Sequence, residues 1–460
     1  MGANGRYAMN CTDDRRFLAN KTDDPLHEAF DSKIAIHAMP RGESIRPEAL
    51  PGLWADVMAA ADGLPIRSIY IHIPFCEDHC LFCGFYKNAY RSDLAEQYVE
   101  ALVQEMELTA GAPFLNARPF QAVYFGGGTP TALPAKSLAR LVSTVHRLFP
   151  LSNDCEITVE GRIYNCDKEK IEAALRAGTN RFSMGVQTFD TRIRKSLGRR
   201  APREKVIESL TYLRDLGSAV AIIDLIYGLP DQSPEIWEED IKTFFGLRLD
   251  GCDLYQLNVF KGGLLEKAVS KGSLPAPATL KEQADYYVQG VALMEAAHYH
   301  RLSVTHWARF SRERNLYNLF SRGRSDCVPL GSGAGGWLGN YFFFVEGSLK
   351  KYLNAIKARR KPLAFGLKRS QRDFLFRDIS YQMELGYCDL NELAERHKMN
   401  LLTILGPIIA QWEKVGLVNL TDGCLYLTRP GEFWAVNLAQ MLIDRLQEDS
   451  LSGSHRGRWS

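Results

Sequence analysis

The sequence lacks any apolar stretch that approaches the ~20 residues needed to cross a bilayer as a helix. Its first 21 residues are polar and mixed in charge, without the apolar core of a secretory signal peptide. We therefore expect a cytoplasmic protein that does not insert into membranes.

A large net charge of one sign is also absent. The 460 residues carry a formal net charge of +2, with 46% hydrophobic and 24% charged residues. No global field attracts such a chain to nucleic acid or to anionic lipid, and we expect no nucleic-acid partner. The length is sufficient for a large enzymatic core with one or two additional domains.

A fourth cysteine is missing from a loop that holds three. Cys76, Cys80 and Cys83 have C-x3-C-x2-C spacing and follow the run Tyr70-Ile-His-Ile-Pro-Phe. This spacing can ligate three irons of a cubane iron–sulfur cluster and leave the fourth iron open to a reactant, whereas clusters with four thiolates mostly carry electrons. A zinc site is the alternative, because His79 would complete a Cys3His shell. The seven other cysteines are scattered singly, which is typical of thiols in a reducing compartment.

Short β-rich runs alternate with amphipathic helical segments from about residue 67. Six strands are predicted, at residues 68–73, 122–125, 156–160, 182–186, 220–226 and 253–259. Helices are predicted at residues 92–110, 168–177 and 280–297, and a further one begins at Ser233-Pro234. Six successive β/α units indicate a parallel barrel, complete or partial, with its chemistry at the carboxyl ends of the strands.

The last quarter of the chain has a different pattern. Helices predicted at residues 390–398 and 401–415 precede a hairpin that turns at Asp422-Gly423. The predicted fold class is therefore α/β, a partial parallel (β/α)6 barrel with a small C-terminal winged-helix-like α+β domain. We expect that small domain to act as a lid or in packing, because it has no basic recognition face for DNA. The expected domains are an N-terminal extension (1–66), the barrel (67–345), the C-terminal domain (346–449) and a flexible tail (450–460).

Polar residues recur where the predicted strands end. The run Gly126-Gly127-Gly128-Thr129-Pro130 follows the second strand, and its glycines leave backbone N–H groups free to bind a carboxylate. Glu160 ends the third strand and Gln187 follows the fourth. Asp224 lies inside an apolar run, where a carboxylate is costly unless it is paired or bound. Together with the cysteine loop, these positions predict a ligand site.

These motifs, with Ser183-Met-Gly-Val-Gln187 and Asp224-Leu-Ile-Tyr-Gly-Leu-Pro230, resemble those of radical S-adenosylmethionine (SAM) enzymes of the oxygen-independent coproporphyrinogen dehydrogenase type. The resemblance covers about residues 67–345. It implies that Cys76, Cys80 and Cys83 ligate a [4Fe–4S] cluster whose open iron binds SAM, and that two SAM molecules bind. The implied SAM contacts are Tyr70, Phe82, Gly127, Gly128, Thr129, Glu160, Gln187, Arg199, Asp224 and Phe260. The family usually has Glu-x-Asp/Asn-Pro after the third strand, and the different Glu160-Gly161-Arg162 here leaves the ribose contact open.

Later segments favour one group within that family. The runs His306–Asn318 and Pro329–Trp337, and residues 30–40, resemble the anaerobic heme-degrading radical SAM methyltransferases, the anaerobilin synthase group. The resemblance implies oxygen-independent opening of the heme ring, transfer of a SAM-derived carbon and release of iron. It also implies an electron-donating reductase or flavodoxin-like partner. One SAM would be cleaved reductively to a 5′-deoxyadenosyl radical, which would activate the second SAM for attack on a heme meso carbon.

Heme offers a flat apolar face, two propionates and an iron, and the segment from residue 301 has groups suited to each. Six arginines lie within 24 positions, and guanidinium groups suit carboxylates. We predict that His306 is catalytic, as a proton donor or an iron ligand, together with Gln187 and Asp224. The predicted substrate contacts are His306, Trp307, Arg309, Arg312, Arg314 and Tyr317. Two alternatives stay open: a coproporphyrinogen III dehydrogenase, and a non-catalytic heme chaperone.

Overall fold

The computed structural model describes residues 14–34 and 42–454. The chain divides into two compact units, one of residues 1–37 with 378–460 and one of residues 38–377. The predicted N-terminal extension is thus shared between the units, and residues 346–377 belong with the barrel rather than with the C-terminal helices. Part of the 30–40 run and the end of the predicted tail lie outside the described residues.

A nine-stranded sheet forms the centre of the larger unit, in the order β10-β11-β9-β8-β7-β6-β5-β2-β12. Its six central strands are parallel and confirm the predicted partial barrel. They are β2 (Arg67–Ile73), β5 (Phe120–Gly127), β6 (Leu151–Gly161), β7 (Arg181–Gln187), β8 (Val220–Tyr227) and β9 (Gly251–Gln256). β12 (Asp326–Leu330) extends the parallel sheet beside β2, while β11 (His306–Ala308) and β10 (His300–Arg301) pair antiparallel at the other edge. The sixth strand therefore ends at Gln256, three residues before its predicted end.

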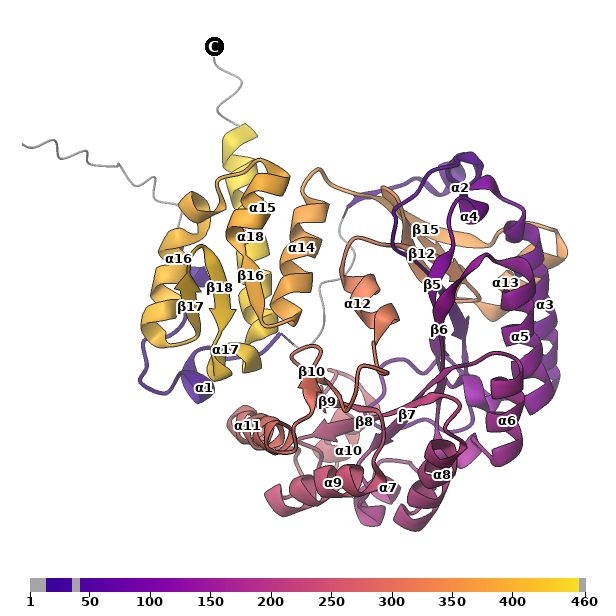
Figure 1. Ribbon diagram of the computed structural model, residues 1–460, viewed down its shortest axis with the longest axis horizontal. Coiled ribbons are helices and arrows are strands. Elements are labelled where there is room, and N and C mark those ends of the chain that lie inside the picture. Colours follow the sequence, from indigo (N-terminus) through magenta and orange to yellow (C-terminus); the bar gives the residue numbers. More distant parts are fainter. Residues whose placement is uncertain (1–13, 35–41, 455–460) are drawn as a thin grey trace, which may run out of the picture. The chain divides into compact units, whose positions relative to one another are not determined.

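Helices cover the outer face of this sheet (Figure 1). They are α3 (Ser92–Ala110), α5 (Ala135–Leu148), α6 (Lys168–Arg176), α8 (Arg203–Leu216), α9 (Pro234–Leu247) and α11 (Leu280–Ala296). Because side chains alternate along a strand, one set of residues packs against these helices and the other faces the inside of the barrel. On β2, for example, Ile69, Ile71 and Ile73 are fully buried in the outer layer. The inward positions are mostly polar, and these carry the candidate site.

Side-chain caps begin several helices, including the one predicted at Ser233-Pro234. The Ser233 hydroxyl accepts a hydrogen bond from the Ile236 amide at the start of α9. Thr279 and Glu282 form a reciprocal capping box at the start of α11. Shorter elements of this unit are α2 (Leu50–Ala59), β3 (Phe75–Cys76), β4 (Asn88–Ala89), α4 (Pro113–Asn116), α7 (Thr191–Ser196), α10 (Leu264–Ser270), α12 (Leu316–Arg322) and α13 (Leu349–Lys357). Unlike the covering helices, α12 lies on the inner side of the sheet, in contact with β5 and β2 (Figure 1).

A second, four-stranded sheet in the larger unit has the order β1-β15-β14-β13. Its strands are β1 (Glu43–Ser44), β13 (Gly335–Leu338), β14 (Tyr341–Val345) and β15 (Leu363–Lys368). The sequence analysis predicted none of these strands. Trp54 of α2 packs edge-on against Phe343 of β14 with ring centroids 5.1 Å apart, which anchors the segment before the barrel to this sheet.

The smaller unit contains the predicted helices and hairpin. α15 (Leu390–His397) and α16 (Leu401–Val415) precede β17 (Val418–Thr421) and β18 (Cys424–Leu427), and β16 (Tyr387–Asp389) completes a three-stranded sheet. Asp422 and Gly423 have φ of 50° and 78°, as a two-residue hairpin turn requires. Trp412 of α16 donates to the Phe17 carbonyl at 2.9 Å, so the N-terminal segment packs within this unit. Its other helices are α1 (Pro25–Glu28), α17 (Arg429–Phe433) and α18 (Ala435–Ser454), while α14 (Asp373–Glu384) spans the boundary between the units.

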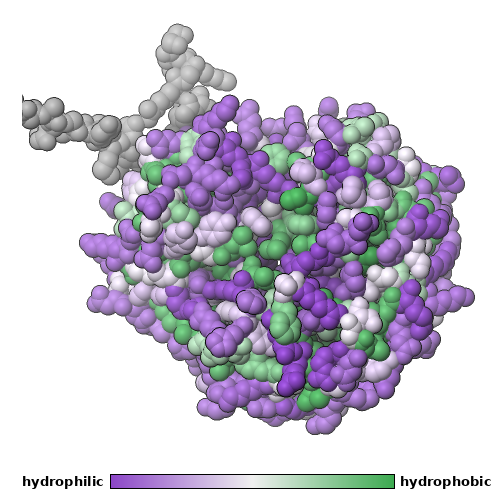
Figure 2. Space-filling model, viewed as in Figure 1, coloured by the Kyte–Doolittle hydropathy of each residue, from purple (hydrophilic) through white to green (hydrophobic). Residues whose placement is uncertain are grey.

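No helix in the described ranges is long and apolar enough to cross a membrane. Hydrophilic residues predominate on the face shown in Figure 2.

A buried carboxylate on α3 fixes the turn that follows β12. Glu105 accepts hydrogen bonds from the Gly331 amide at 2.8 Å, the Tyr352 hydroxyl at 2.7 Å and the Lys361 ammonium at 2.7 Å. The side chain of Glu105 is fully buried, so each of these donors would lose its hydrogen-bond acceptor if the carboxylate were removed. The Gly331 turn, which lies beside the end of β2, depends on this network.

We therefore expect Glu105→Ala to destabilise the larger unit by about 3 kcal/mol or more, the usual cost of breaking a buried charge pair. Glu107→Ala on the same helix is the matched control, because Glu107 is half exposed and pairs with the exposed Arg147. The control should lose less than about 1 kcal/mol. Urea unfolding followed by circular dichroism measures both, and equal losses would contradict the assigned role of Glu105.

Candidate functional site

The cysteine loop begins directly after β2 and is closed by short hydrogen bonds. The Cys76 sulfur accepts from the Thr129 hydroxyl at 3.4 Å, the Cys80 sulfur from the Arg199 guanidinium at 3.4 Å, and the Cys83 sulfur from the Phe85 amide at 3.3 Å. All three thiols are free of disulfides. Burial raises the pKa of the Cys76 and Cys83 thiols, so metal binding would have to displace their protons.

The far side of the loop is held by α7 and α10. The Leu81 amide donates to the Leu197 carbonyl, and the Leu81 carbonyl accepts from the Leu265 amide. Phe82 packs against the buried apolar cluster that contains both leucines. A Cβ atom on Gly84 would lie only 3.0 Å from the Phe260 ring, so the structure brings Phe260 to the loop as well.

The glycine turn after β5 packs against the start of the cysteine loop. The Gly128 amide donates to the Ile73 carbonyl at 2.8 Å, and a Cβ on Gly128 would lie 2.6 Å from the Phe75 carbonyl oxygen. Gly127 has φ of +110°, a conformation that only glycine adopts easily. Its amide donates to Glu160, which also accepts from the Tyr124 hydroxyl at 2.6 Å. The predicted contacts Gly127, Gly128, Thr129 and Glu160 therefore lie together beside the cysteines.

Asp224, Gln187 and Arg199 complete this end of the sheet. Asp224 pairs in register with Gly185 of β7 and with Asp253 of β9. Burial, Asp253 and Glu160 together raise the pKa of Asp224 to about 7. Gln187 has φ of 67°, and the Arg199 guanidinium donates to the Gly185 carbonyl. The predicted SAM contacts thus converge on the carboxyl ends of β2 and β5 to β8.

Three buried polar atoms at this end of the sheet lack a hydrogen-bond partner among the described residues: Gln187 Oε1, Arg199 Nε and His72 Nε2. Buried polar groups are nearly always paired, so these three atoms are suited to pair with a polar ligand. SAM, with its amino, carboxylate and ribose groups, fits that requirement. The three thiols and the unpaired polar atoms therefore fit a cluster with SAM beside it.

The zinc alternative fits the same loop less well. Within the described ranges, no three His, Cys, Asp or Glu side chains converge on a position for one metal ion. The His79 ring, which a Cys3His site would need, stacks on Tyr86 with centroids 4.0 Å apart. In a cubane each thiolate ligates a different iron, so the cysteines need not converge on one point.

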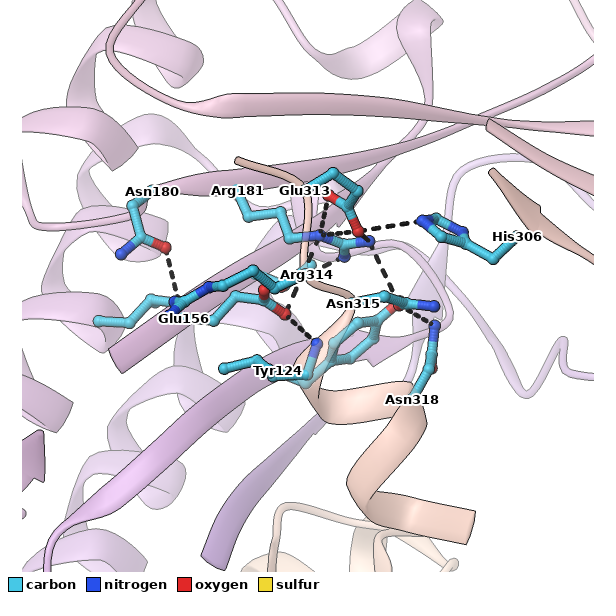
Figure 3. Close-up of polar contacts among 12 residues, drawn as sticks. Tyr124, Glu156, Asn180, Arg181, His306, Glu313, Arg314, Asn315 and Asn318 are labelled. Carbon is cyan, nitrogen blue, oxygen red and sulfur yellow. Dashed lines mark hydrogen bonds and ion pairs between the residues drawn. The ribbon is translucent and has the colours of Figure 1, made fainter. Parts of the chain in front are cut away.

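A buried charge network occupies the inside of the barrel farther from the cysteines (Figure 3). Arg181 at the start of β7 makes a two-pronged ion pair with Glu313, with N–O distances of 2.8 and 2.9 Å. His306 Nε2 lies 3.0 Å from Glu313, and His306 Nδ1 lies 2.9 Å from Asp253 in an ion pair that lacks the alignment of a hydrogen bond. All four side chains are almost fully buried.

These contacts set the protonation of the network. Burial acts to lower the pKa of His306, but Asp253 and Glu313 outweigh it and raise the pKa to about 9. Burial acts to raise the pKa of Glu313, but Arg181 and His306 outweigh it and lower the pKa to about 2. His306 is therefore an imidazolium at neutral pH. Each ring nitrogen faces a carboxylate, so neither is available to ligate heme iron, and of its two predicted roles only that of proton donor fits the structure.

The other predicted substrate contacts do not gather at the cysteine loop. Arg309 donates to the Arg248 carbonyl just before β9, Arg312 to the Gly217 carbonyl before β8, and Arg314 to Asp154 near the start of β6. These are the amino-terminal ends of the strands, opposite to the end at which the cysteine loop begins. These arginines therefore do not lie beside the cysteine loop, and their contact with heme stays a prediction.

The two aromatic residues predicted to contact heme lie on different faces of the sheet. Trp307 lies on the opposite face of β11 from His306, is 1% exposed and has the Arg301 guanidinium 5.4 Å from its ring. It belongs to the outer core and cannot form a wall inside the barrel. Tyr317 of α12 lies inside, stacked on Tyr124 at 4.4 Å and on Tyr70 at 5.7 Å between ring centroids.

Several residues of the site were not predicted. Arg181, Asp253, Glu313 and Glu156 lie inside the barrel, and His72 lies between the two glycine turns. Asp253 gave a usable signal, because a carboxylate within a predicted strand needs a partner as Asp224 does. Glu313 gave no such signal, because it lies within an arginine-rich segment that was interpreted as a substrate-binding loop.

Residues 70–244 match the Radical SAM superfamily, the class that the three-cysteine loop, the glycine turn and the partial barrel define. The chain is 39% identical to anaerobilin synthase of Escherichia coli O157:H7 over 406 residues, which cover 88% of this chain and 89% of that protein. The chain therefore belongs to the radical SAM family that includes anaerobilin synthase.

More distant relatives cover similar lengths. The heme chaperone HemW of Bacillus subtilis (strain 168) is 28% identical over 80% of this chain and 96% of its own. Oxygen-independent coproporphyrinogen III oxidase of Escherichia coli (strain K12) is 27% identical over 83% of this chain and 86% of its own. The solved structure of the Escherichia coli coproporphyrinogen III oxidase has a TM-score of 0.73 at 24% identity, covering 85% of this chain and 93% of that chain, and so shares the fold.

Membership of the family implies a [4Fe–4S] cluster and SAM as cofactors. We propose that Cys76, Cys80 and Cys83 hold the cluster, because they are the cysteines that share one loop at chelating spacing. Bound there, the cluster would supply the electron that cleaves SAM. The chain's own residues would position SAM: the glycine turn would offer backbone N–H groups, and Glu160 and Asp224 would offer carboxylates.

Replacing any one of the three cysteines with alanine should abolish the broad ~400 nm absorbance and the bound sulfide of the anaerobically reconstituted protein, since each thiolate ligates its own iron. Cys424→Ala in the smaller unit is the control and should reconstitute as wild type. Full iron and sulfide content in a Cys76/Cys80/Cys83 triple variant would show that the cluster lies elsewhere.

His306 should also make stability fall as pH rises. Its folded pKa of about 9 lies above the ordinary value of 6.5, so its stabilising contribution is fully present below pH 6.5 and is lost as pH rises through 9. Within that window one group changes the free energy of unfolding by at most about 1.4 kcal/mol per pH unit. Urea unfolding of the protein between pH 6 and 9.5 should show this slope, and His306→Gln should flatten it. An unchanged slope in His306→Gln would assign the pH dependence to other groups.

Proposed function

We propose that this enzyme degrades heme without oxygen by radical SAM methyl transfer, opening the porphyrin to a linear tetrapyrrole and releasing iron. The 39% identity to anaerobilin synthase across 88% of the chain carries the proposal, because the heme chaperones and coproporphyrinogen III oxidases compared with it are 25% to 29% identical. The protein would draw electrons from a reductase or flavodoxin-like partner.

The arrangement at the strand ends supports two SAM molecules. Glu160 and the Gly127 amide form one set of polar groups, and Gln187 of β7, Asp224 of β8 and Arg199 after α7 form a second set. The SAM bound to the cluster would lie nearest the cysteine loop, with Tyr70, Phe82 and Phe260 around its adenosine. The second SAM would lie near Asp224 and supply the transferred carbon.

Heme would enter on the inner side of the sheet. Tyr317, Tyr70 and Tyr124 form a stack of nearly parallel rings there, with interplanar angles of 19° to 24°, and such faces suit a flat macrocycle. His306 would contribute as a proton reservoir: its imidazolium is next to Asp253, which neighbours the protonatable Asp224. This relay would deliver a proton to the opened ring without exposing the site to water.

Two other activities of relatives remain as alternatives. A heme chaperone would bind heme and release it unchanged. A coproporphyrinogen oxidase would act on an iron-free porphyrinogen and form vinyl groups. Neither would transfer a carbon from SAM to heme.

Anaerobic incubation with heme, a reductant and SAM labelled with carbon-13 in its methyl group tests the proposal. The expected product is a ring-opened tetrapyrrole whose mass includes the label, with free iron detected by a chelator. The Cys80→Ala variant is the control and should leave heme intact. Unchanged heme with the wild-type protein would favour the chaperone, and an unlabelled ring-opened product would exclude methyl transfer.

A further inference from the structure

His72, at the carboxyl end of β2, has a ring nitrogen, Nε2, that takes part in none of the protein contacts described above. The side chain is 8% exposed and points inward, beside the glycine turn after β5. Its Nε2 atom is buried and has no hydrogen-bond partner in the part of the chain that the structure describes. An unpaired buried nitrogen costs about 1–3 kcal/mol, so a ligand that pairs with it would recover that cost.

Glycine turns lie on both sides of the ring, and the turn after β5 leaves room for nothing larger than hydrogen. A Cβ on Gly127 would lie 2.4 Å from the His72 ring, and one on Gly333 would lie 3.6 Å from its Cδ2 and Nε2 atoms. Both glycines have positive φ, +110° and +90°. The ring is therefore held between two glycine turns, with Nε2 at the edge nearest Gly333.

The partner of the other ring nitrogen determines which atom carries the proton. The Tyr70 hydroxyl lies 3.0 Å from Nδ1. Burial raises the pKa of Tyr70 well above its ordinary value, so the hydroxyl keeps its proton, and Nδ1 is the acceptor that lies within hydrogen-bond distance of it. Burial and Lys87 lower the pKa of His72 to about 4, so the ring is neutral. A neutral ring that accepts at Nδ1 carries its hydrogen on Nε2.

We propose that the Nε2–H group of His72 donates a hydrogen bond to a ligand carboxylate at the glycine turn. Two carboxylates are possible sources under the proposed function, on which this inference rests: the amino-acid end of SAM and a propionate of heme. Both carry the same chemistry, and a neutral donor pairs with either without adding a charge to the site. His72 is then a binding residue, and Tyr70 fixes its tautomer.

His72→Asn tests the inference, because the shorter amide can still accept from Tyr70 but does not reach the position of Nε2. His72→Phe, which keeps the ring volume, is the second variant if the first does not fold. His300→Asn, an exposed histidine on β10, is the matched control. Thermal unfolding and iron content establish that each variant is folded and reconstituted. Equilibrium titrations then measure the Kd of SAM, of heme and of heme dimethyl ester.

A loss of SAM affinity of roughly tenfold or more, with heme affinity unchanged, would assign the SAM carboxylate. A similar loss for heme that is absent for the dimethyl ester would assign a propionate. Wild-type affinity for all three ligands, or equal losses for heme and its ester, would overturn the inference. If the wild-type protein binds SAM but not heme, the proposed function fails, while the SAM comparison still decides the role of His72.

Discussion

The ion pair between Arg181 and Glu313 is the interaction on which the inside of the barrel depends. Both charges are removed from water, which is costly unless the geometry is excellent and the remaining atoms are paired. The two-pronged contact meets the first condition, and His306, Asn315 and Thr158 supply further partners. Because Glu313 comes from the segment after β11 and Arg181 from β7, this pair joins parts of the chain 132 residues apart.

The two ends of the sheet carry different groups. The segment from Arg309 to Asn315 crosses the amino-terminal ends of the strands and is fixed there by backbone carbonyls and Asp154. α12 then enters the inner side and places Tyr317 against Tyr70 and Tyr124. Charged groups thus close one end, and the cysteines, the glycine turns and the unpaired polar atoms are concentrated at the other. The placement of chemistry at the carboxyl ends follows the general rule for parallel barrels.

The sequence predicted the parallel strands well, and the residues predicted for the cofactor end lie together, since both depend on local patterns. The outward-facing positions of a strand covered by helices must be apolar, and chelating cysteines must be close in the chain, so periodicity and spacing are sufficient. The arginines predicted to contact heme lie away from the cysteine loop for a physical reason. Arginine suits a propionate, but it suits a backbone carbonyl or Asp154 equally, and composition does not distinguish the two. Composition also does not show which face of a strand Trp307 occupies. Side chains alternate along a strand, so Trp307 lies on the outer face while its neighbour His306 faces inward. The β13–β15 sheet has no clear local signal, because its strands pair with segments distant in the chain.

The polar groups inside the barrel are held in two different ways. The cofactor end uses backbone amides and thiols, which are positioned by glycine turns and by the loop spacing. The inner face is built instead from side chains on separate elements, Asp224, Asp253, His306 and Tyr317, held by pairwise contacts. Under the proposed function, these side chains would shape the macrocycle site and deliver the proton, so a substitution at one of them would change the substrate step while leaving the cysteine loop in place. The cysteine loop identifies only the class of reaction, and the substrate would be selected by the inner face of β8, β9, β11 and α12.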